Sequence, residues 1–159
     1  MNIMLCGNIG TGKSTVASKL ALNHNYIIIN DDSLITSLHG GNYMYKQELK
    51  NFYKLAKQQM ARCASLYGLN CVLDGTFITR EKRKRWLKII SSPVICLDFG
   101  PGNNISLKRR QNNSRGKSLE RWEIVHKLFK YQYEQPSITE GFEKVIGVND
   151  AFETKSIFI

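Results

Sequence analysis

The 159-residue sequence lacks long apolar runs, low-complexity tracts and a basic leader. None of its apolar stretches approaches the roughly 18 residues that a membrane-spanning helix needs, and the first residues show no signal-peptide pattern. We therefore expect no membrane segment. Proline is scarce, at 3 residues, and no repeat or Gly/Ser linker divides the chain. With 42% hydrophobic residues, the composition predicts one globular domain over residues 1–159.

Cysteine is also sparse, and its spacing is not that of a metal centre. The sequence has four cysteines, Cys6, Cys63, Cys71 and Cys96. Their separations do not match those of zinc ligands, and the three histidines share no spacing with them. Most of the cysteines lie within apolar stretches, so we expect reduced core thiols in a cytoplasmic protein.

Acidic residues are outnumbered by basic ones. The chain has 13 Asp and Glu against 23 Lys and Arg, for a formal net charge of +10. An excess of this size favours polyanionic partners such as nucleic acid, or several phosphate groups in one site. A basic composition can also serve solubility alone, so the positions of the charges must decide between these interpretations.

Short apolar segments alternate with helical patterns along the chain. The apolar segments predict strands at 2–6, 26–29, 70–73, 93–97 and 144–148. The intervening patterns predict helices near 16–22, 33–39, 45–67, 79–90, 104–112 and 118–132. Such alternation is typical of a parallel sheet with crossover helices. Three of the strands end in Asn, Asp or Gly, where an open α/β sheet binds its ligand.

The strongest motif is GNIGTGKS at residues 7–14, which matches the P-loop pattern G-x-x-x-x-G-K-[ST] between a strand and a helix. Its glycines let backbone N–H groups turn toward a polyphosphate, and the next helix directs its N-terminus at the same charge. Lys13 is expected to reach the β- and γ-phosphates, and Ser14 to hold Mg²⁺. The motif predicts binding of ATP with Mg²⁺ by Gly7, Asn8, Ile9, Gly10, Thr11, Gly12, Lys13, Ser14 and Thr15.

Carboxylates follow the second and third predicted strands. Asp31 and Asp32 come directly after the second strand, where one of them can accept a proton from an attacking hydroxyl and the other can cap the next helix. Asp74 and Thr76 follow the third strand, a position that suits support of Mg²⁺ or contact with substrate. These residues predict phosphoryl-transfer chemistry at the same sheet edge.

Basic residues cluster in three segments. Arginines at 109, 110 and 115 run along a helix into Gly116, which predicts a mobile lid over about 104–118. The helix near 45–67 carries a lysine stripe that is either a solvated face or a track for a sugar-phosphate backbone: Lys46, Lys50, Lys54 and Lys57. Its predicted core side is Leu49, Phe52, Ala56, Met60 and Cys63. The charge run at 80–85 is expected to be a solvated face, with a role in substrate binding as the less favoured alternative.

The P-loop, together with the segments 29–32, 73–76, 108–116, 133–136 and 140–142, resembles the P-loop polynucleotide kinase family. These are 5′-hydroxyl kinases and their single-domain relatives, often encoded by phages, and the likeness covers about residues 2–149. The resemblance implies a three-layer, nucleotide-kinase-like P-loop α/β fold with a five-stranded parallel sheet and an arginine-bearing helical lid. It also implies phosphoryl transfer from ATP to a hydroxyl, most simply the 5′ end of a nucleic acid.

The resemblance further implies individual roles. Lys13 and Ser14 take the phosphate and Mg²⁺ roles, and Asp32 is the general base, with Asp31 as the other candidate and otherwise a substrate contact. Arg115 matches the lid arginine that stabilises the transition state, and either Arg109 or Arg110 matches an earlier lid arginine that contacts the nucleotide. Asp74 and Thr76 match a substrate- or metal-side pair.

Two departures from the family pattern concern the acceptor. The family often has arginine three residues after its base and asparagine after the threonine of the third strand, where this chain has Ile35 and Phe77. The alternative hypothesis is therefore a small-molecule kinase of the same fold, and a nucleotide-dependent ATPase or switch is a third. The sequence leaves the oligomeric state open.

Overall fold

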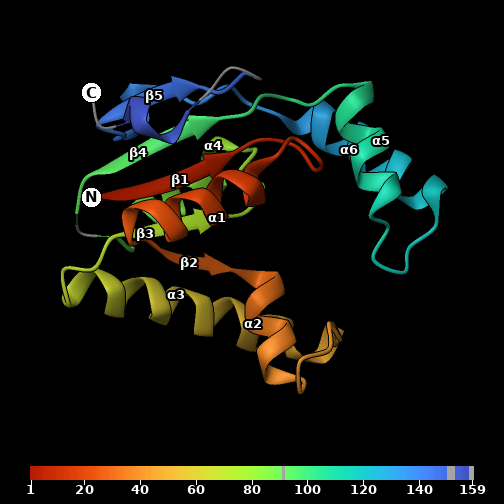
Figure 1. Cartoon of the computed structure of the whole chain (residues 1–159), viewed down its shortest axis with the longest axis horizontal. Coiled ribbons are helices and arrows are strands. Elements are labelled where there is room, and N and C mark those ends of the chain that lie inside the picture. The colour runs from red at the N-terminus through yellow and green to blue at the C-terminus, as the bar shows by residue number, and fades with distance from the viewer. Residues whose placement is uncertain (91, 150–152, 158–159) are drawn as a thin grey trace.

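A five-stranded, all-parallel sheet forms the centre of the protein (Figure 1). The computed structural model describes residues 1–90, 92–149 and 153–157. The strand order is β2-β3-β1-β4-β5, and the strands are β1 (Asn2–Cys6), β2 (Ile27–Asn30), β3 (Cys71–Asp74), β4 (Val94–Asp98) and β5 (Lys144–Gly147). The predicted parallel sheet is confirmed, with strand boundaries within one residue of those expected.

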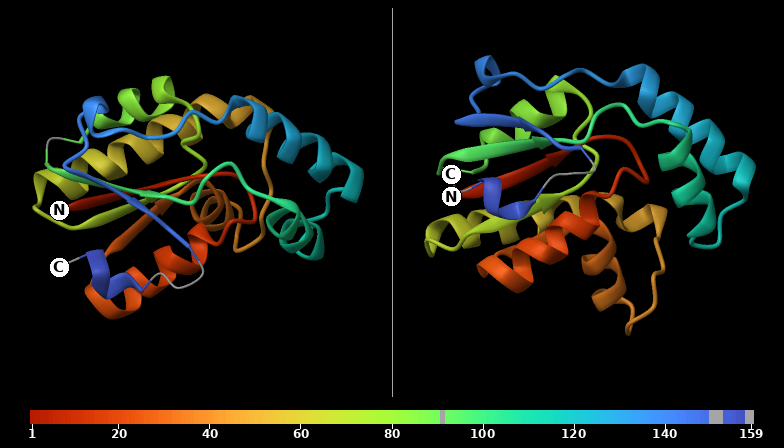
Figure 2. Two further views of the ribbon diagram at one scale, coloured as in Figure 1. Left: turned by 90° about the horizontal axis from the view of Figure 1, so that it is seen from above. Right: turned by 45° about the horizontal axis from the view of Figure 1, so that its top comes forward.

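Helices cover both faces of this sheet (Figure 2). The longer ones are α1 (Lys13–His24), α2 (Asp31–Leu38), α3 (Lys50–Leu66), α4 (Arg80–Leu87), α5 (Asn104–Asn112) and α6 (Leu119–Gln132). Successive residues of β1 point to opposite faces, so Ile3 and Leu5 join a core with α1, while Met4 and Cys6 join a core with α3 and α4. The three-layer P-loop fold expected from the sequence is thereby confirmed.

The register of the strands brings their polar ends together. Leu5 and Asn30 each pair with Asp74, and Cys6 pairs with Asp98. Parallel strands end at the same edge of a sheet, so the polar residues at these ends become neighbours there. Helices α5 and α6 project beyond this edge as an arm, and residues 113–118 connect them (Figures 1 and 2).

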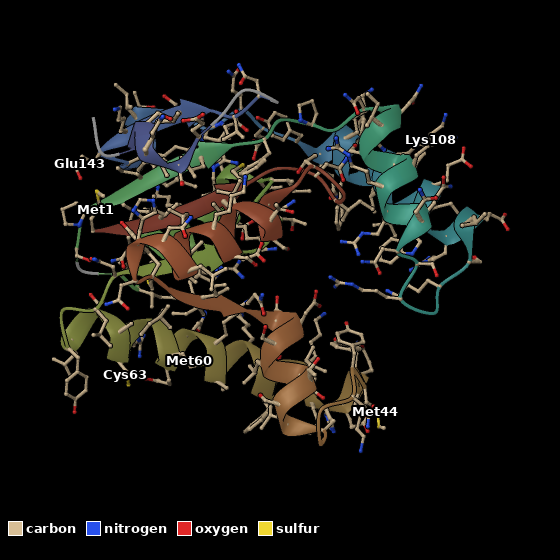
Figure 3. All side chains as sticks on the ribbon, in the orientation of Figure 1. Met1, Met44, Met60, Cys63, Lys108 and Glu143 are labelled. Carbon is tan, nitrogen blue, oxygen red and sulfur yellow. The ribbon has the colours of Figure 1, made fainter. Side chains whose placement is uncertain are left out.

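Helix α3 packs on a different side from the one that its sequence predicts. Phe52, Met60 and Cys63 are exposed, as Figure 3 shows for the labelled Met60 and Cys63 on the outer side of the helix. The buried side is Tyr53, Lys57, Ala61 and Ala64. Small alanines allow the helix to approach the sheet closely, and this packing outweighs the apolar content of the other stripe. Cys63 is therefore not a core thiol, whereas Cys6, Cys71 and Cys96 are buried.

Two charge patterns also differ from expectation. Lys57 is buried rather than part of an exposed stripe. In α4, Arg83 is fully buried, because Glu140 of the 3₁₀ helix η2 (Ile138–Glu140) accepts hydrogen bonds from its Nε and Nη2 at 2.8 Å. A buried charge needs such a partner, so part of the 80–85 run is structural rather than solvated.

The end of the chain contacts α1. Ile157 belongs to the 3₁₀ helix η3 (Thr154–Ile157) and is buried in the core beside α1. Phe158 and Ile159 lie outside the described residues. Across the described ranges, every helix is too short or too polar to cross a membrane.

Candidate active site

A cavity of about 410 Å³ lies at the polar edge of the sheet, between the P-loop, the ends of β2 and β3, and the helical arm. Its lining includes most of the predicted site residues: Ile9, Gly10, Thr11, Gly12, Lys13, Ser14, Thr15, Asp31, Asp32, Asp74, Thr76, Arg109, Arg110 and Arg115. Gly7 and Asn8 are not part of this lining. The Asn8 side chain donates to the carbonyls of Pro101 and His126, at 2.7 and 3.0 Å, and so fixes the base of the P-loop.

The P-loop touches the arm through Gly10. At this residue φ is +72°, and a Cβ would lie 1.9 Å from the carbonyl oxygen of Ser106 in α5. Gly12, by contrast, has φ of +95° and open space beside it. Gly10 therefore permits close contact between the loop and the arm, whereas Gly12 supplies the backbone turn that starts α1.

Lys13 is buried at the start of α1, where its Nζ donates to the Asn8 carbonyl and to Thr11 Oγ1. Burial lowers the pKa of its amine to about 8, although the nearby charge of Asp74 acts in the opposite direction. A buried ammonium that is not fully neutralised favours an anion beside it. This position therefore suits phosphate oxygens.

The next residue, Ser14, is joined to the end of β3. Its hydroxyl donates to Asp74 Oδ2 at 2.8 Å, and the Asn30 amide donates to the same oxygen at 3.4 Å. A hydroxyl and a carboxylate side by side are the hard oxygen ligands that Mg²⁺ prefers. These two side chains fit a magnesium ion bound beside the P-loop, and whether Asp74 serves the metal or the substrate stays a prediction.

The two aspartates of α2 have different surroundings. Asn30, not an aspartate, caps the helix by accepting from the Ser33 N–H at 2.7 Å. Asp31 forms an ion pair of 2.5 Å with Lys57, whose amine lies 5.3 Å from the centroid of the Trp86 ring. Asp32 instead contacts Arg115, which extends across the cavity from the arm. Asp31 is thus held from the interior by Lys57, and Asp32 faces the arm.

Lys82 is a cavity residue that sequence reasoning missed. Its Nζ donates to Thr76 Oγ1 at 3.1 Å and lies 5.3 Å from the ring of Phe77. Its pKa is lowered, chiefly by burial and then by the charge of Lys57, while Asp31 opposes the shift. Within the described ranges it forms no ion pair with a carboxylate. In the sequence, nothing distinguished Lys82 from the other basic residues of the 80–85 run as a residue that would line the cavity.

Two cations of the arm, Arg110 and Lys117, lie against the ring of Trp122. The Arg110 guanidinium carbon lies 4.9 Å from the centroid of the Trp122 ring, and the indole donates to the Ser114 carbonyl at 2.7 Å. Arg110 Nε is buried and has no hydrogen-bond partner among the described residues, so it is available to an acceptor such as phosphate. Arg115 has φ of +50° next to Gly116, a turn that directs its side chain into the cavity.

Arg109 connects this cavity to a second one of about 340 Å³. The second cavity lies between the P-loop and α5, with Thr11, Phe99 and Ile105 in its lining. This second cavity adjoins the P-loop at Thr11. Arg109 and Arg110 therefore occupy different positions, the first at the junction of the cavities and the second inside the larger one.

Comparison with known proteins identifies the family. Residues 3–136 match the AAA domain family AAA_33, so the chain belongs to this family. No curated protein matches the sequence. Its fold is that of P-loop kinases, a class of nucleotide-binding domains, as three solved structures illustrate.

A protein of Chloroflexus aurantiacus J-10-fl, provisionally described as a kinase, aligns with a TM-score of 0.70 and 14% identity over 98% of this chain and 90% of that one. A gluconokinase from Sinorhizobium meliloti 1021 aligns with a TM-score of 0.62 and 17% identity, over 98% of this chain and 86% of that one. A chain of the Pnkp1/Rnl/Hen1 RNA repair complex aligns with a TM-score of 0.64 and 14% identity, over 84% of this chain but 46% of that one. At these identities the likeness concerns the fold.

Proposed function

We propose that this protein is an ATP-dependent kinase that transfers the γ-phosphate to the 5′-hydroxyl of a polynucleotide. The observation that carries the proposal is the arrangement across the larger cavity. Lys13, with Ser14 and Asp74, lies on one side, and Asp32 in contact with Arg115 lies on the other. A phosphoryl donor and a hydroxyl acceptor have room to meet between these groups.

The donor side suits ATP. The P-loop and the buried ammonium of Lys13 suit the triphosphate, and the adjoining cavity near Phe99 suits the nucleoside. Ser14 and Asp74 would hold Mg²⁺ directly or through its waters, and the ion would supply neutralisation of charge on the β- and γ-phosphates.

The acceptor side supplies the proton acceptor and the lid. The acceptor oxygen would form a bond to the γ-phosphorus as the bond from that phosphorus to the β–γ bridging oxygen breaks, and Asp32 would take the hydroxyl proton. Arg115 and the unpaired Nε of Arg110 would stabilise the charge on the transferring group. Asp31, held by its ion pair with Lys57, would orient the acceptor.

A labelled-phosphate assay tests the proposal. Wild-type protein is incubated with γ-labelled ATP and a panel of 5′-hydroxyl oligonucleotides, nucleosides and small alcohols, and we expect the label on the oligonucleotides. Asp32→Asn should reduce turnover about 10²- to 10⁴-fold, as expected for loss of a general base, while ATP binding stays within a few-fold. Near-normal turnover of Asp32→Asn, with loss in Asp31→Asn, would overturn the assignment of the base.

The second candidate is a kinase of the same fold that phosphorylates a small metabolite. The structural likeness to a gluconokinase supports it, as does Ile35, which is buried where an acceptor-binding arginine is common in polynucleotide kinases. Salt dependence separates the two candidates. The KM for a polynucleotide should rise steeply with ionic strength, because binding releases counterions, whereas that for a neutral small acceptor should not.

A further inference from the structure

The segment between α2 and η1 (Gln47–Leu49) exposes an unusual run of large side chains. Residues 39–46, here called the aromatic loop, have no helix or strand. Three successive residues in it, Tyr43, Met44 and Tyr45, are 46%, 50% and 44% exposed. A run of exposed large apolar side chains on a small protein more often serves binding than folding.

The aromatic loop is nevertheless held in place. The ring of Tyr45 lies 5.7 Å from that of Tyr53, a buried residue of α3. The Tyr53 hydroxyl is in turn 2.9 Å from His39 Nε2, so both ends of the loop contact the same buried ring. The exposed faces of Tyr43 and Tyr45 are therefore presented on a supported segment, which lowers the ordering cost of binding a planar ligand.

The aromatic loop also continues the larger cavity. Tyr43 lines that cavity together with Asp32 and Arg115. Burial raises the pKa of the Tyr43 hydroxyl, and the charge of Asp32 raises it further, which is consistent with their closeness. Figure 3 shows Met44 across from α5, where Lys108 is labelled, so the loop forms the lip of the cavity opposite the arm.

A row of cations leads away from this lip. Lys46 ends the aromatic loop, and Lys50 and Lys54 follow at intervals of four residues, about one helical turn, along the start of α3. All three are exposed, and none forms an ion pair within the described part of the chain. Aromatic faces beside unpaired cations are the two components with which proteins bind unpaired nucleotides.

We propose that the aromatic loop and these three lysines form a binding surface for single-stranded nucleic acid. Bases near the 5′ end stack on Tyr43 and Tyr45, and the phosphates behind them follow Lys46, Lys50 and Lys54 while the terminal hydroxyl enters the cavity beside Asp32. The inference rests on the proposed kinase function and names its substrate as an unpaired strand. A duplex end would have to fray before its bases could stack in this way.

Acceptor kinetics test the stacking residues. With ATP saturating, a single-stranded 5′-hydroxyl 12-mer should have a lower KM than a blunt duplex of the same sequence. Tyr43→Ala/Tyr45→Ala should raise the 12-mer KM on the order of 5- to 100-fold, the range expected for lost base stacking, and leave the KM for ATP unchanged. Tyr45→Phe should behave as wild type because stacking needs the ring. Tyr67→Ala, which removes an exposed tyrosine at the far end of α3, is the matched control.

Salt dependence tests the lysines. Binding of a labelled single-stranded 12-mer is measured by fluorescence anisotropy without ATP at several salt concentrations. Replacing two phosphate-contacting lysines should reduce the slope of log K against log[salt] by about 1.4, so we expect this change for Lys50→Gln/Lys54→Gln. Lys84→Gln/Lys88→Gln, which removes two exposed lysines from the α4 region, should leave the slope unchanged.

The outcomes separate this inference from the proposed function. If oligonucleotides are phosphorylated but the tyrosine and lysine variants match wild type, the surface is wrong and the kinase function stands. If no polynucleotide accepts phosphate, the kinase proposal fails, and the binding assay still decides the surface. Single-strand binding that is weaker in the tyrosine and lysine variants than in wild type would support the surface. Absence of single-strand binding in the wild-type protein would overturn it.

Discussion

The contact between the P-loop and the helical arm leads to a sharp prediction at Gly10. In Gly10→Ala, the new Cβ would meet the Ser106 carbonyl oxygen of α5 at 1.9 Å, and this backbone atom cannot turn away as a side chain could. The positive φ of +72° adds a second cost, because an L-residue is strained in that region. The loop and the arm must therefore separate or the chain must bear the strain.

The two costs can be estimated separately. A left-handed backbone at a non-glycine residue costs about 1–2 kcal/mol, and overpacking of a tight contact costs about 1–3 kcal/mol more. The free energy of unfolding of Gly10→Ala should therefore be lower than that of wild type by roughly 2–5 kcal/mol. Gly68→Ala provides the control, because Gly68 has φ of +65° but no atom within 4 Å of its added Cβ. The free energy of unfolding of Gly68→Ala should therefore fall only by the cost of the left-handed backbone.

Urea unfolding and ATP titration measure the consequences. The free energy of unfolding should fall further in Gly10→Ala than in Gly68→Ala by about 1–3 kcal/mol, the overpacking term. ATP affinity should fall only in Gly10→Ala, because displacement of the arm moves Arg109 and Arg110 relative to the P-loop. Equal losses of stability in the two variants, together with unchanged ATP affinity, would refute the close contact as the reason for glycine at this position.

Three further predictions concern buried charged and titratable groups. Burial lowers the pKa of His126, so the unfolded chain binds more protons than the folded one. The free energy of unfolding should therefore decrease as the pH falls through about 6.5, and urea unfolding of His126→Gln should lack this decrease. Glu140→Gln leaves the Arg83 cation without its buried partner and should lose about 3–5 kcal/mol in thermal unfolding, whereas Glu81→Gln, in an exposed pair, should lose under about 1 kcal/mol. Lys57→Met removes the ion-pair partner of Asp31 and should lower kcat about 10- to 100-fold with ATP affinity retained. An unchanged kcat would exclude a role of Lys57 in positioning Asp31.

Much of the fold could be predicted from local patterns. Apolar segments closed by polar residues predicted all five strands. The signal was clearest for β1, β3 and β4, because a strand buried on both faces is apolar over its whole length. The P-loop could be located because its glycines and its Lys–Ser pair are adjacent in sequence. The side on which α3 packs could not be predicted, because two stripes of the helix are partly apolar and contact with the sheet selects the one with Ala61 and Ala64.

The candidate site also combines residues that the sequence predicted with arrangements that only the tertiary structure shows. The sequence by itself determined the parallel α/β architecture and the residues of the P-loop, since both depend on neighbours in the chain. Only the tertiary structure decided that Lys82 lines the cavity, that Lys57 pairs with Asp31 whereas Asp32 contacts Arg115, and that Tyr43 forms the lip. Each of these facts depends on residues from separate elements, and their distances are set by how the elements pack rather than by spacing along the chain.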